Sequence, residues 1–104
     1  MTQRILPDAL EDTRLTAARL ERERVGYGIA FSALFDDAAD RCLAAPYLYA
    51  PTEDGPAGIE TREVFIERFN QRVIYAVTDT EVVILAVVHA YRRPGARAAR
   101  AEQV

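Results

Sequence analysis

A run of seven apolar residues, 82–88, is the feature that most restricts how this chain of 104 residues can fold. With Glu81 it forms a continuous β-branched and aliphatic stretch, which suits a central strand covered on both faces better than a buried helical segment. Seven residues are also far too few to span a bilayer. We therefore expect a sheet that contains residues 81–88, in a chain long enough for one compact domain.

Three further runs favour strands. Residues 62–69 alternate in the way of a half-buried strand, and residues 72–77 form a second β-rich run. Residues 78–80 (Thr-Asp-Thr) suit a hairpin turn between this run and residue 81. Near the N-terminus, residues 3–6 suit a short first strand, which Pro7 would end.

Helical periodicity marks the first half of the chain. One helix is predicted from Pro7 to about Arg24, because proline is favoured at the first helical position. A second helix has the stronger apolar stripe: Tyr27, Phe31, Leu34, Phe35, Ala38 and Cys42. Gly26 and Gly28 interrupt the two helices, and Pro46 follows the second. The pattern predicts an antiparallel helical hairpin.

The predicted order is β-α-α-β-β-β, with the helices segregated from most strands. This is an α+β layout in which an N-terminal short strand and a helical hairpin pack on a three- to four-stranded antiparallel sheet. Residues 51–58 are rich in turn formers and suit a connecting loop. We assign residues 1–93 to a single domain and residues 94–104 to a C-terminal tail, which has little to bury and is expected to fray. The alternative for this tail is a terminal helical turn rich in alanine and arginine.

Charge and cysteine content exclude several classes of protein. The net charge is -3, although all thirteen basic residues are arginine. The chain lacks the high pI typical of nucleic-acid-binding domains, so direct binding of duplex DNA is not expected. Cys42 is the sole cysteine, so no intramolecular disulfide is possible and a small core residue is expected. No cofactor or metal site is indicated by the spacing of potential ligands.

The first residues argue against secretion. Residues 1–12 carry charges and a proline, and they lack the apolar core of a signal peptide. We therefore expect a cytoplasmic protein without membrane association.

Four segments stand in a fixed order along the chain: Pro-Asp-Ala-Leu-Glu-Asp at 7–12, residues 28–46, Phe-Asn-Gln-Arg-Val-Ile-Tyr at 69–75, and residues 83–89 followed by Arg92, Arg93 and Pro94. In this order they resemble the first helix, the second helix with its following proline, the Phe-x-x-Arg-Val-x-Tyr strand and the final strand of RelE/ParE superfamily toxins. The resemblance covers nearly the whole chain. Two positions depart from the family pattern, because Leu6 stands where a helix-capping serine is frequent and Thr13 replaces an apolar residue.

The resemblance implies the toxin subunit of a type II toxin–antitoxin pair, whose firmest partner is a cognate antitoxin protein. Two activities divide the superfamily. RelE-like members resemble ribosome-dependent mRNA endonucleases, in which basic residues and often a C-terminal tyrosine act on the ribose and the scissile phosphate. ParE-like members poison DNA gyrase through protein contacts, without a nuclease site.

A nuclease of this kind needs cations arranged around its transition state. The candidate catalytic residues are Arg72, His89 and Arg92, since the arginines match family positions and imidazoles exchange protons near neutral pH. Against this reading, Glu63 and Phe65 occupy the strand where RelE-like nucleases carry lysines. The C-terminal tyrosine of RelE-like nucleases would be expected near Ala98, where this chain has none. Tyr91 is the only tyrosine after the last strand, and it precedes Arg92.

Each candidate also has a structural reading. Arg72 suits a strand arginine paired with Glu63 or Glu81, and His89 suits a strand-end histidine satisfied by the backbone. The Arg92-Arg93 pair suits a solvated chain end. The candidate contacts to a target or partner are Arg72, Tyr75, His89, Arg92 and Arg93. The missing lysines and tyrosine favour a ParE-like gyrase inhibitor. The alternatives are a RelE-like endonuclease acting on ribosome-bound mRNA, or a degenerate, non-toxic member that acts only as a binding module.

Overall fold

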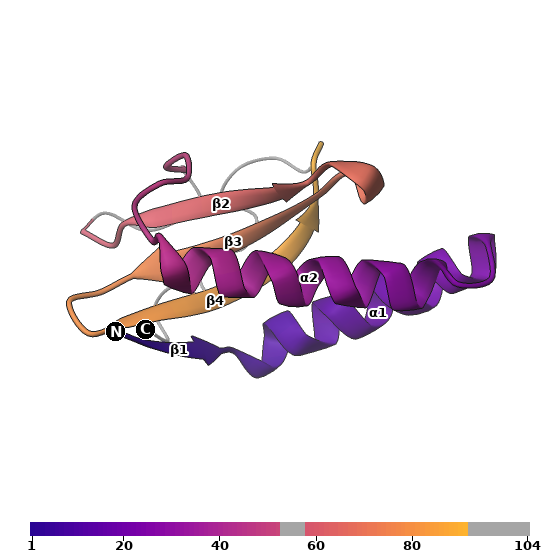
Figure 1. Cartoon of the computed structure of the whole chain (residues 1–104), viewed down its shortest axis with the longest axis horizontal. Coiled ribbons are helices and arrows are strands. Elements are labelled where there is room, and N and C mark those ends of the chain that lie inside the picture. Colours follow the sequence, from indigo (N-terminus) through magenta and orange to yellow (C-terminus); the bar gives the residue numbers. More distant parts are fainter. Residues whose placement is uncertain (53–57, 92–104) are drawn as a thin grey trace.

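The computed structural model describes residues 1–52 and 58–91, and folds them into a pair of helices on one face of a four-stranded sheet (Figure 1). The elements in chain order are β1 (Thr2–Ile5), α1 (Pro7–Glu23), α2 (Tyr27–Ala44), β2 (Thr61–Ile66), the 3-10 turn η1 (Glu67–Phe69), β3 (Gln71–Val77) and β4 (Glu81–His89). The predicted α+β class and β-α-α-β-β-β order are confirmed. The expected boundary between a domain and a tail at residue 93 lies outside the described residues.

The strands lie in the order β1-β4-β3-β2. β2, β3 and β4 pair antiparallel, as expected, whereas β1 runs parallel to β4. The sheet is therefore mixed. Short turns force β2, β3 and β4 to reverse direction one after another. The helical hairpin and two strands separate β1 from β4 in the chain, so no turn fixes their relative direction.

β4 lies between β1 and β3, and every residue from Val82 to Val88 is buried. This confirms the prediction of a central strand covered on both faces. The register between β3 and β4 shifts at Ile74 and Tyr75, which marks a bulge in the ladder. A bulge bends and twists a strand locally, so it helps to set the direction in which β4 leaves the sheet.

The helices close one side of the core. The expected apolar stripe of α2 is confirmed at its fully buried members, Phe31, Phe35, Ala38 and Cys42. α1 contributes only Ala9 and Leu20 as buried residues. In the described ranges, neither helix is long and apolar enough to cross a membrane.

Both departures from the family pattern are accommodated locally. Leu6 caps α1 without a side-chain hydrogen bond, but its carbonyl accepts the N–H groups of Ala9 and Leu10, and its side chain is buried. The hydroxyl of Thr13 donates to the Ala9 carbonyl at 2.9 Å, so this polar group is satisfied within the helix.

The prediction of one strand over residues 62–69 is wrong at its C-terminal end. β2 ends at Ile66, and the next three residues form η1. Asn70 then adopts a left-handed conformation with φ of 53°, and its N–H donates to the Glu67 carbonyl. Asparagine tolerates this region better than most residues. The alternating pattern therefore continued past the point where the chain turns into β3.

A single carboxylate organises the turn between the helices. Both oxygens of Glu21 accept the N–H of Gly26 at 3.0 Å, and Oε1 also accepts the N–H of Gly28 at 3.0 Å. These donors belong to the start of α2, where backbone N–H groups lack partners within the helix. A Cβ on Gly28 would lie 2.9 Å from the Ala17 carbonyl oxygen, so this glycine allows the two helices to approach closely.

Replacing Glu21 with alanine is expected to lower the free energy of unfolding by about 1 kcal/mol, because the start of α2 loses its cap. The measurement is urea denaturation followed by circular dichroism. Glu23→Ala is the matched control, because Glu23 makes only an exposed ion pair with Arg19, and its loss should cost less than about 0.5 kcal/mol. Equal losses in both variants would contradict the capping role.

Candidate functional site

The candidate residue His89 lies where β4 ends and β3 begins. His89 is the last residue of β4 and pairs with Gln71, the first residue of β3. The His89 side chain is exposed, and its Nδ1 accepts the N–H of Tyr91 at 3.3 Å. The rings of His89 and Tyr91 are 5.2 Å apart. His89 thus combines a backbone hydrogen bond with a face open to solvent.

Arg72 is held by its neighbours. It is only 9% exposed, its Nε pairs with the Glu63 carboxylate, and its Nη2 donates to the Thr52 hydroxyl at 3.2 Å. Of the two acidic partners expected for this arginine, the structure pairs it with Glu63, while Glu81 pairs with Arg4. The Arg72 guanidinium therefore links β3 to β2 and to the loop after α2.

Tyr75 lies inside the molecule. It is fully buried, and its hydroxyl donates to the Pro46 carbonyl at 2.6 Å. Burial raises the pKa of the Tyr75 phenol well above its ordinary range. Side chains alternate along a strand, so Tyr75 and Arg72 point to opposite faces of the sheet. The structure therefore does not bring these two candidates together, and Arg92 and Arg93 lie outside the described residues.

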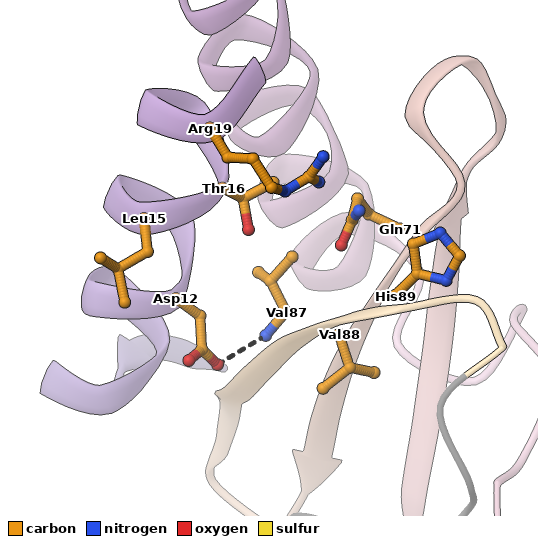
Figure 2. A pocket seen from close by; sticks show the side chains of 8 residues that line it. All are labelled: Asp12, Leu15, Thr16, Arg19, Gln71, Val87, Val88 and His89. Atoms are coloured by element: carbon orange, nitrogen blue, oxygen red, sulfur yellow. Dashed lines mark hydrogen bonds between the residues drawn. The ribbon is translucent and has the colours of Figure 1, made fainter. Parts of the chain in front are cut away.

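A cleft of about 260 Å³ adjoins His89, between α1 and the ends of β3 and β4. Figure 2 shows the α1 side chains on one side and those of Gln71 and His89 on the other. We call it the His89 cleft; its lining residues are Asp12, Leu15, Thr16, Arg19, Gln71, Val87, Val88 and His89.

The short length of β1 creates this cleft. β1 pairs with β4 only as far as Ile5 and Ile84, after which the chain turns into α1. The outer edge of β4 then faces the helix instead of another strand. Asp12 covers part of that edge, because its Oδ2 accepts the N–H of Val87 at 3.1 Å (Figure 2). A carboxylate of α1 therefore satisfies a backbone group at the edge of β4.

Gln71 supplies a buried polar group to the cleft. Its side chain is 2% exposed, and its Nε2 donates to the Phe69 carbonyl at 3.2 Å. Within residues 1–52 and 58–91, no protein donor reaches the Gln71 amide oxygen. A buried acceptor is normally satisfied, so we expect a water molecule or a ligand donor at this oxygen.

The described lining of the cleft offers hydrogen-bonding groups and charge. Cys42, the one thiol, is fully buried in the core, away from the cleft lining. In the described ranges, His, Cys, Asp and Glu side chains form no cluster of three or more that would hold a metal ion. The sequence did not predict that the cleft is lined by Asp12, Arg19 and Gln71. Each of these residues is ordinary on the surface of a helix or in a strand.

Comparison with known proteins does not identify the chain. Neither a scan against protein-family models nor a search of curated proteins returned a match. The chemistry of the site therefore rests on the geometry described above.

A double-mutant cycle tests whether Arg72 is structural. Arg72→Met is expected to lower the free energy of unfolding by about 1–3 kcal/mol, because it leaves the half-buried Glu63 carboxylate without its cation. Adding Glu63→Gln should cost less than the sum of the two single changes, since both remove the same interaction. Urea denaturation of the four proteins provides the values. Strictly additive losses would show that the pair is not energetically coupled.

Cys42 should be unreactive until the chain unfolds. Burial raises the pKa of its thiol to about 12, against about 8.5 in an unfolded chain. The thiol therefore stays neutral in the fold while the unfolded chain ionises, so its contribution to stability is present below pH of about 8.5 and declines as the pH rises further. A thiol reagent at pH of about 8 should label the chain only in denaturant; rapid labelling of the native chain would contradict this burial.

Proposed function

We propose that this chain is the toxin subunit of a type II toxin–antitoxin pair of the RelE/ParE family, acting in the cytoplasm by binding and poisoning DNA gyrase. A cognate antitoxin neutralises it. The observation that carries the proposal is the relation between the two strand motifs. Residues 69–75 lead into β3, residues 83–89 lie in β4, and Gln71 pairs with His89. The segments that resemble the family thus meet at one end of adjacent strands.

The state of Arg72 favours binding over cleavage of mRNA. A phosphoryl-transfer transition state is stabilised by cations already directed at it. The Arg72 guanidinium instead engages Glu63 and Thr52, and its side chain is almost entirely buried. The Glu63 carboxylate next to it would repel a phosphate. This arrangement supports a target contact made by His89 and the cleft beside it.

The outer surface of the helical hairpin suits an antitoxin. Leu10 and Leu15 of α1 are each 53% exposed, and Ile29 of α2 is 79% exposed. A groove between the helices, with a volume of about 580 Å³, is lined mainly by small and apolar residues that include Ala17, Gly28 and Ile29. Exposed apolar surface on a small domain often marks a binding site. The apolar face of an amphipathic antitoxin segment fits this groove.

The test combines growth of cells under tightly controlled expression with a DNA supercoiling assay on purified chain and gyrase. We expect growth arrest and loss of supercoiling. His89→Ala should raise the concentration for half-inhibition of gyrase by roughly tenfold, as for a residue near the centre of an interface. Thr80→Ala is the control, because Thr80 is exposed in the turn at the opposite end of β4.

Two other outcomes would replace the proposal. Growth arrest with unaffected gyrase and cuts at codon-associated positions in transcripts would establish the ribosome-dependent endonuclease. Normal growth at full expression would establish a non-toxic binding module.

A further inference from the structure

Two guanidinium groups gather around one tyrosine ring at the turn between the helices. The Cζ of Arg24 lies 5.7 Å from the centroid of the Tyr27 ring, and the Cζ of Arg68 lies 5.6 Å from the same centroid. Arg68 also lies 5.0 Å from the centroid of the Phe69 ring, which packs edge-on against Tyr27. We call Arg24, Tyr27, Arg68 and Phe69 the arginine–tyrosine cluster. It joins the start of α2 to η1 and thus to the beginning of β3.

These two arginines differ from most others in the described part of the chain. Six arginines there form ion pairs with carboxylates: Arg4, Arg14, Arg19, Arg41, Arg62 and Arg72. Within residues 1–52 and 58–91, the guanidinium groups of Arg24 and Arg68 have no carboxylate partner. Both side chains are exposed. Arg22 also forms no ion pair in this range, but Arg24 and Arg68 are the two of these three that contact the Tyr27 ring.

The aromatic rings explain how the cations are held but not what neutralises them. The negative face of an aromatic ring attracts a cation, although only modestly at an exposed site. That attraction orients the guanidinium groups and restricts their rotamers. Each guanidinium has five N–H donors, and a carboxylate can accept two of them side by side.

A second cleft places the cluster next to the candidate site. Its volume is about 240 Å³, and its lining residues are Arg19, Leu20, Glu23, Tyr27, Arg68, Phe69, Asn70 and His89. Arg19 and His89 belong to this cleft and to the His89 cleft alike. Among the described lining residues, Glu23 is the one carboxylate, and it already pairs with Arg19 at 2.9 Å. The lining is therefore short of negative charge beside Arg68.

We propose that the arginine–tyrosine cluster and the cleft beside it bind an acidic segment of a protein partner, with Asp or Glu carboxylates seated on Arg24 and Arg68. A protein segment is favoured over a nucleic acid because the chain carries a net charge of -3, which repels a long polyanion. Two cations and a small cleft match one or two carboxylates. The proposal does not depend on toxicity or on gyrase, since it rests on the charges and rings of this surface alone.

The test is a titration of the full-length ¹⁵N-labelled chain with an acetylated hexaglutamate peptide, followed by NMR. We expect saturable shifts at the side-chain Nε–H signals of Arg24 and Arg68 and at the backbone amides of Tyr27 and Asn70. The affinity should fall steeply in about 0.5 M salt, because exposed ion pairs are screened. Hexathymidylate, which carries a similar charge on phosphates, serves as the competing class of ligand.

Matched variants decide whether the cluster is responsible. The double change Arg24→Gln with Arg68→Gln should weaken hexaglutamate binding by about tenfold. Arg14→Gln removes an exposed arginine of α1 that already pairs with Glu11, so it should leave binding unchanged. Arg24→Lys with Arg68→Lys keeps the charge and should restore part of the affinity. Equal shifts at all exposed arginines, unchanged binding by the glutamine variant, or tighter binding of hexathymidylate would each overturn the proposal.

Discussion

The pairing of β1 with only the first part of β4 is the constraint on which the arrangement of the molecule depends. β1 is four residues long and covers β4 from Glu81 to Ile84. The remainder of β4 therefore meets α1 at its outer edge, where the Asp12 carboxylate takes the Val87 N–H in place of a strand. A longer β1 would complete the ladder and occupy the space of the His89 cleft. One short strand thus places the open end of the central strand beside a helix that carries polar side chains.

The polar residues of the molecule divide into groups that hold the fold and groups that remain open to a partner. Arg72, Glu21 and Tyr75 satisfy buried or backbone groups. Glu21 joins the two consecutive helices, whereas Arg72 and Tyr75 join elements distant in the sequence. His89 and Arg68 instead lie exposed at the end where β4 finishes and β3 begins. Because Arg72, the one cation on β3, pairs with Glu63 within the fold, the proposed mode of action is recognition of a protein surface. The proposed site for an acidic partner and the cleft at the end of β4 share Arg19 and His89, so they adjoin on one surface.

Sequence reasoning succeeded wherever one local pattern determined one element. The apolar run at 82–88 and the stripe of α2 predicted a buried central strand and a packed helix, because burial requires apolar residues at fixed spacing. The predicted strand over residues 62–69 was wrong at residues 67–69, which form the turn η1. Asn70 follows this turn in a left-handed conformation. Alternation cannot reveal such a turn, because it describes only which side chains share a face.

The candidate site was less predictable than the fold, since it depends on contacts between distant residues. His89 was identified because histidine is rare in this chain, but Asp12, Arg19 and Gln71 carry no local signal of their role. The parallel direction of β1 was equally hidden, because nothing local to residues 2–5 encodes the strand they join. The pairing of Arg72 with Glu63 was one of two options that the sequence allowed, and cross-strand register selects it.

The central proposal is that Arg72 holds β3 to β2 and does not contact the target. A charge-swapped variant tests this role. Glu63→Arg combined with Arg72→Glu keeps an ion pair between β2 and β3 but reverses the charge on β3. Growth under tight induction is compared with that of the original chain, after circular dichroism has verified that the variant folds. The account predicts growth arrest at the same level of expression. A folded variant that no longer arrests growth would show that the positive charge of Arg72 acts on the target itself, and would contradict the central claim.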